Sequence, residues 1–108
     1  MATEDKTTGS FEMINTLAAT PDSRALTVTW DSGEESTLSA EILRREARDA
    51  YSIRERVDHG VVRVLPGIAI TALVQVGHGG VNVHFSDGHD RAIYPFEYLR
   101  ELVDRFDN

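Results

Sequence analysis

The sequence predicts an α+β domain in which a mainly antiparallel or mixed β-sheet, built from two hairpin-helix units, is covered by helices. Alternating apolar and polar residues, turns that end in glycine, and helix-forming segments directly after them lead to this prediction. Leu26, Val28 and Trp30 alternate with threonines, and a period of two places them on one face of a strand. Short hairpins cannot hide their apolar faces alone, so we expect both units to share one sheet.

The first unit begins with this strand and turns at Asp31-Ser32-Gly33. A short polar side chain before a glycine that tolerates positive φ is typical of a hairpin turn. Ser39 is a good N-cap for a helix that starts at Ala40. No Gly or Pro follows before Gly60, but the apolar positions become sparse, so we expect a loop after about residue 48.

The second unit follows a connection in which residues 61–65 are predicted to form a short strand. Residues 68–76 have apolar side chains on both faces and are rich in β-branched residues, which indicates a central strand. Residues 81–85 alternate, and Ser86-Asp87-Gly88 makes the second hairpin turn. Pro95 suits the first position of the closing helix. That helix carries an apolar stripe at i, i+3, i+4 and i+7, formed by Leu99, Leu102, Val103 and Phe106.

The two units are similar to each other, with Gly33 and Gly88 at equivalent turns. Either the duplication of a small unit or the general likeness of hairpin-helix folds explains this. Residues 24–108 are assigned to the domain. Residues 1–23 are rich in Thr, Ser, Ala and acids and are interpreted as a flexible tail. A docked helical turn there is the alternative, formed by Phe11, Met13, Ile14 and Leu17.

Composition excludes several functions. Eighteen acidic residues against eleven basic ones give a net charge of -7, which disfavours nucleic acid as a partner. The sequence has no cysteine, and therefore no thiolate nucleophile or thiolate metal ligand. It also has no membrane-spanning segment and no secretory signal, so we expect a cytoplasmic protein.

Complete catalytic motifs are absent. No His is followed two residues later by an acid, as non-haem iron oxygenases usually require, and the glycines at 77–80 do not fit a dinucleotide fingerprint. His89, with Asp87 or Asp90, is a candidate acid-base group, although Asp87 and Gly88 also suit a simple turn. We therefore predict that the domain is not an enzyme.

Arginines and one tyrosine are the candidate interaction residues. Arg44, Arg45 and Arg48 begin an arginine-rich segment that extends to Arg63 and offers paired hydrogen bonds to an acidic partner. Interleaved acids in the same segment make a solvated ion-pair face the alternative. Tyr98, next to a core-facing leucine, is expected to be partly exposed and to serve as an interface anchor.

Four segments together resemble the N-terminal domain of gamma-butyrobetaine hydroxylase, by their order and spacing. They are Trp30-Asp-Ser-Gly33, Leu38-Ser-Ala-Glu-Ile-Leu-Arg44, Phe85-Ser-Asp-Gly-His-Asp90 and Ile93-Tyr-Pro-Phe-Glu-Tyr-Leu-Arg100. The resemblance implies an accessory module. In the hydroxylases this domain precedes an iron and 2-oxoglutarate dependent catalytic domain and carries a structural zinc bound by three Cys and one His. Relatives also occur alone in bacteria, or joined to P-loop proteins with iron-sulfur clusters.

The zinc-binding cysteines of that family are replaced here. By the resemblance they fall on Ala47, Asp49 and Ser52, and the zinc-binding histidine falls on His89. One His and one carboxylate leave zinc underligated. We therefore expect a protein-interaction module with an unknown protein partner and no cofactor. The alternative is a metal-binding accessory domain for iron-sulfur or iron-enzyme maturation, with residual zinc or iron at His89 and Asp49. The oligomeric state stays open.

Overall fold

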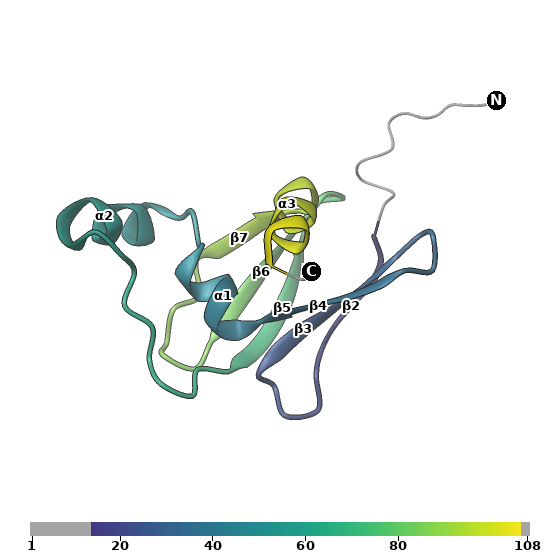
Figure 1. Cartoon of the computed structure of the whole chain (residues 1–108), viewed down its shortest axis with the longest axis horizontal. Coiled ribbons are helices and arrows are strands. Elements are labelled where there is room, and N and C mark those ends of the chain that lie inside the picture. Colours follow the sequence, from purple (N-terminus) through teal and green to yellow (C-terminus); the bar gives the residue numbers. More distant parts are fainter. Residues whose placement is uncertain (1–13, 107–108) are drawn as a thin grey trace.

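A computed structural model describes residues 14–106 of the chain (Figure 1). None of the helices in this range is long and apolar enough to cross a membrane. The elements follow the chain in the order β2 (Ile14–Ala19), β3 (Ala25–Trp30), β4 (Glu35–Ser39), α1 (Ala40–Arg45), α2 (Ala50–His59), β5 (Ile70–Val76), β6 (Gly80–Phe85), β7 (Ala92–Pro95) and α3 (Phe96–Phe106).

The α+β class and both hairpin-helix units are confirmed, as β3-β4-α1 and β6-β7-α3. All strand pairs are antiparallel. They form two three-stranded sheets, ordered β2-β3-β4 and β5-β6-β7, where we expected one shared sheet. The Ile70 backbone N–H donates to the Ser23 carbonyl across the sheets at 2.7 Å. Figure 1 shows α1 and α3 next to each other over the strands.

The core lies between the two sheets and these helices, as the apolar alternation predicts. Leu26, Val28 and Trp30 of β3 are buried, as are Val81, Val83 and Phe85 of β6. The α3 stripe is confirmed too, because its leucines and Val103 are buried and Phe106 packs against the core. The indole N–H of Trp30 donates to the Ser36 hydroxyl at 2.9 Å, which satisfies the polar atom of the buried ring.

The interpretation of residues 1–23 as a flexible tail is wrong for Ile14–Ala19, which form β2 and pair with β3. Ile14 and Leu17 both pack against the core. Their spacing of three suggested a helical turn, but it arises from an irregular register between Ile14 and Thr16, because an extra residue shifts the alternation. Phe11 and Met13 lie outside the described residues.

Two further strand predictions are wrong. Residues 61–65 form no strand, although Val62 is buried. β5 is an edge strand and not a central one. Val74 and Val76 are apolar but exposed on its outer face, so apolar residues on both faces did not mean burial on both. Pro95 ends β7, and α3 begins one residue later at Phe96.

Side chains from other elements bind the carbonyl groups at the end of α1, which have no partner within the helix. The Tyr94 hydroxyl of β7 donates to the Leu43 carbonyl, and the Tyr98 hydroxyl of α3 donates to the Glu46 carbonyl at 2.5 Å. Burial raises the pKa of Tyr94, so this hydroxyl keeps the proton that it donates. The end of α1 is therefore fixed to β7 and α3.

Replacing Tyr94 with Phe is expected to lower the free energy of unfolding by about 1–2 kcal/mol, because the buried Leu43 carbonyl loses its donor. Tyr51→Phe is the matched control, since Tyr51 is 64% exposed and should change stability by less than about 0.5 kcal/mol. Urea unfolding of both variants measures the difference. Equal stabilities would show that the Tyr94 hydrogen bond contributes nothing.

Candidate functional site

A second helix, α2, follows α1 where we predicted a loop after residue 48. Asp49 is its N-cap and accepts a hydrogen bond from the Ser52 backbone N–H at 3.1 Å. Gly60 ends the helix with a φ of 83°, in the left-handed region that glycine adopts at little cost. An Asp eleven residues before a Gly, with no Gly or Pro between them, is the signal that could have predicted this helix.

Polar contacts attach α2 to the rest of the domain, because Ser52 is its one buried residue. The Ser52 hydroxyl donates to Asp49 Oδ1 at 2.8 Å and accepts from Arg44 Nη1 at 3.0 Å. Arg56 donates to the Arg45 carbonyl at 2.9 Å and to the Ala47 carbonyl at 2.6 Å. Both ends of the loop between α1 and α2 are thus bound by side chains.

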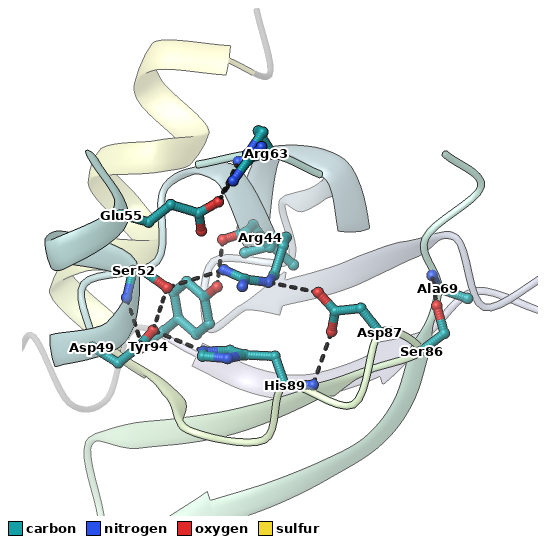
Figure 2. Close-up of polar contacts among 11 residues, drawn as sticks. Arg44, Asp49, Ser52, Glu55, Arg63, Ala69, Ser86, Asp87, His89 and Tyr94 are labelled. Carbon is teal, nitrogen blue, oxygen red and sulfur yellow. Dashed lines mark hydrogen bonds and ion pairs between the residues drawn. The ribbon is translucent and has the colours of Figure 1, made fainter. Parts of the chain in front are cut away.

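The hairpin turn after β6 completes a closed ring of hydrogen bonds (Figure 2). Arg44 Nε donates to Asp87 Oδ2 at 2.9 Å, and Asp87 Oδ1 accepts from the His89 backbone N–H at 2.8 Å. His89 Nε2 lies 3.0 Å from Asp49 Oδ1. We call Arg44, Asp49, Ser52, Asp87 and His89 the polar ring. It joins α1, the start of α2 and the β6-β7 turn.

The charges of the polar ring are removed from water but paired. Arg44 is 4% exposed, and a cation at that depth is tolerated only when its donors are bound. The side chains of His89 and Asp49 are 10% and 8% exposed. Burial acts to raise the pKa of Asp49, but the hydrogen bonds from His89 and Ser52 outweigh it and hold this pKa below its ordinary value. Asp49 is therefore an ionised carboxylate, and His89 Nε2 carries the proton between them.

This geometry does not match a nucleophilic triad. In such a triad the histidine lies between the nucleophile and the acid, whereas here Asp49 lies between Ser52 and His89. Ser52 is also fully buried. Asp87 binds the backbone of His89 and not its ring, so Asp87 is placed as a turn former.

The structure brings together the positions that the resemblance assigns to the zinc site, but their chemistry does not fit zinc. His89 Nε2 and Asp49 Oδ1 bind each other, and Ser52 binds Arg44. Ala47 offers no side-chain donor. Within residues 14–106, no three His, Asp or Glu side chains are grouped closely enough to hold an ion. Tetrahedral zinc requires four ligands, of which at least three come from the protein.

Two of the four predicted interaction residues are not on the surface. Arg44 belongs to the polar ring. Tyr98 is 5% exposed, so the expectation that it is partly exposed is wrong. Its ring lies nearly parallel to that of Tyr94, with centroids 6.2 Å apart, and the Arg48 guanidinium covers it at 3.6 Å. Arg45 and Arg48 do reach the surface, where each has an acidic neighbour within 3.7 Å.

Sequence reasoning missed the exposed apolar side chains of α2. Ile53 and Val57 lie one turn apart on the helix, and Val61 follows its C-cap. They are 46%, 76% and 51% exposed. We call these three residues the α2 apolar face. Recognising α2 as a helix was necessary to see them as one surface, since isolated apolar residues between arginines carry no such signal.

Asp49→Asn tests the charge within the polar ring, because Asn keeps the N-cap function. The folded-state pKa of Asp49 lies below 3.8, so the ionised group stabilises the fold above that pH. The contribution is lost as the pH falls through the lower folded-state pKa. The wild type should therefore be the more stable protein at pH 6, and its advantage should shrink below pH 3.8. Urea unfolding at several pH values measures this, and a pH-independent difference would contradict it.

Comparison with known proteins shows which family has this fold. The chain matches the family model described as gamma-butyrobetaine hydroxylase-like, N-terminal, over residues 17–100. It is 31% identical to a protein of unknown function of the DUF971 family from Acidithiobacillus ferrooxidans ATCC 23270, with a TM-score of 0.68, covering 86% of this chain and 94% of that one.

A solution structure determined by NMR is also similar, with 25% identity, a TM-score of 0.61, and coverage of 94% of this chain and 74% of that one. No curated protein matches. The family match extends over most of the chain, from β2 to α3. This chain belongs to the family of gamma-butyrobetaine hydroxylase-like N-terminal domains.

Proposed function

We propose that this domain is a non-catalytic accessory module that binds another protein through the α2 apolar face. The observation that carries the proposal is that Val57, at the middle of this face, is 76% exposed on a helix whose polar side is bound to the body of the domain. Apolar side chains gathered on one exposed face are typical of interaction sites. Figure 1 shows α2 at one end of the molecule, away from α3.

The polar ring supports this role because it fixes α2 before any partner binds. The helix has little apolar burial of its own, and a helix of ten residues is marginally stable in water. Asp49 and Ser52 bind its first turn to Arg44 and His89. A surface that is ordered in advance loses less conformational entropy on binding. The ring therefore serves recognition indirectly, by holding the apolar face in one orientation.

The proposal includes no metal and no cofactor. His89 and Asp49, the residues closest to a metal site, use their polar atoms on each other, which removes support from the alternative of a metal-binding maturation domain. About one equivalent of zinc or iron in protein purified without a tag would contradict this part of the proposal.

Ile53→Glu is expected to reduce partner binding at least tenfold, because it places a charge within the α2 apolar face. Protein immobilised through its C-terminus is exposed to lysate of the source cells, and the retained proteins are quantified by mass spectrometry. The predicted result is a small set of proteins retained by the wild type and lost from Ile53→Glu.

Ile93→Glu is the matched control. Ile93 is the same residue type and is 47% exposed, compared with 46% for Ile53, but it lies on β7. Both variants introduce the same charge, so a non-specific effect of charge would act on both. Equal retention by Ile53→Glu and wild type, or equal loss from both variants, would refute a role for the α2 apolar face.

A further inference from the structure

A groove opens between the two sheets along their facing edges. Its walls are β2, with Ile14 and Leu17, and β5, with Leu73 and Gln75, while Val81 and Phe96 lie deeper. It encloses about 340 Å³, within the range of ligand pockets. The hydrogen bond between Ile70 and Ser23 joins the two sheets at the start of β5, whereas Leu73 and Gln75, from the later part of β5, line the groove.

The two strands that border this groove lack two of the usual protections of sheet edges, a charged residue and a proline, although each has one irregularity of register near its start. Among the strands of residues 14–106, β2 and β5 are the outer ones of their sheets on this side, and neither contains a charged residue or a proline. Exposed edges in natural proteins are normally short, charged, interrupted by proline or a bulge, or covered, because their free N–H and C=O groups pair with other chains. The irregular register of β5 ends at Ala72, which leaves a regular ladder to Val76.

The opposite edges of the same sheets are protected. β7 has four residues and ends in Pro95, which cannot donate to a ladder. β4 begins with Glu35, runs directly into α1 and packs against α3. β2 and β5 thus place thirteen residues without a charge or a proline at two facing edges, in a chain with 27% charged residues.

We propose that β5 binds an extended, uncharged peptide segment of a partner protein by strand addition. The main chain of the segment pairs with residues 72–76. Every second side chain enters the groove against Leu73, Val81 and Phe96, and the intervening side chains cover Val74 and Val76, which are 47% and 39% exposed. Backbone pairing supplies the affinity of such a complex, and the pocket selects the side chains. This site is separate from the α2 apolar face.

A phage-displayed library of random dodecapeptides, selected on the immobilised full chain, provides the probe. The expected binders are uncharged and alternate apolar residues with small polar ones. One binder is then resynthesised as a series of peptides, each with a single N-methyl group at a different backbone position. The affinity should fall at least tenfold when the methyl group is at every second position, and should stay unchanged at the positions between. This period of two is expected because only every second backbone N–H of an added strand points toward the strand that it pairs with.

Gln75→Lys is expected to lower the affinity for the selected peptide at least tenfold, since it places a charge at the open side of the groove. Thr71→Lys is the matched control on the same strand, because Thr71 is exposed and does not line the groove; it should change affinity less than threefold. Ile53→Glu should leave the affinity unchanged, so this test is independent of the α2 proposal.

Three outcomes would overturn the proposal. They are the absence of any binder that distinguishes wild type from Gln75→Lys, N-methyl effects without a period of two, and a full-length chain that sediments as a dimer and becomes monomeric in Gln75→Lys. The last outcome would assign the groove to a second copy of this chain.

Discussion

The closed hydrogen-bond ring around Arg44 is the interaction on which the position of α2 depends. α1 and α3 are held by apolar burial over the sheets, but α2 has one buried residue, and that residue is a serine. Its place is determined by an arginine from α1 and an aspartate and a histidine from the β6-β7 turn. A buried ion pair contributes stability only where its remaining donors and acceptors are also bound, and a ring meets that condition for Arg44 and Asp49.

This arrangement explains how a member of the family manages without thiolates at the positions assigned to zinc. A metal site and a ring of charged hydrogen bonds both join segments that are distant in sequence. Here Asp49 and Ser52 belong to α2, whereas His89 is forty residues away on the second hairpin. The carboxylate of Asp49 binds both His89 and Ser52, so three of the positions that the resemblance assigns to zinc form a cross-link made of hydrogen bonds. The charge of Asp49 makes the strength of this cross-link depend on pH.

Much of the fold follows from local patterns in the sequence. The alternation in β3 and β6, the turns at Gly33 and Gly88, and the stripe of α3 each depend on neighbouring residues, and all were predicted. The position of a strand within its sheet was not predicted, because β5 carries apolar residues on both faces and yet lies at an edge. β2 was missed because an irregular register gave its core residues the spacing of a helix.

The candidate site was predicted only in part. Asp49 and His89 were paired through the family resemblance, and the structure places them in contact. The burial of Tyr98 and Arg44 depends on how α1, α3 and the β6-β7 turn meet, which no spacing in the chain reveals. The α2 apolar face was invisible for a related reason, since exposure is a property of the assembled fold.

Native-state hydrogen exchange in Arg44→Met tests most directly whether the polar ring holds α2. The predicted result is that amide protection in α2 falls at least tenfold more than protection in α3, and that Arg54→Met, which removes an exposed pair with Asp58, leaves both helices unchanged. If α2 keeps its protection in Arg44→Met, or if α2 and α3 lose protection equally, the ring is not what fixes α2 to the domain.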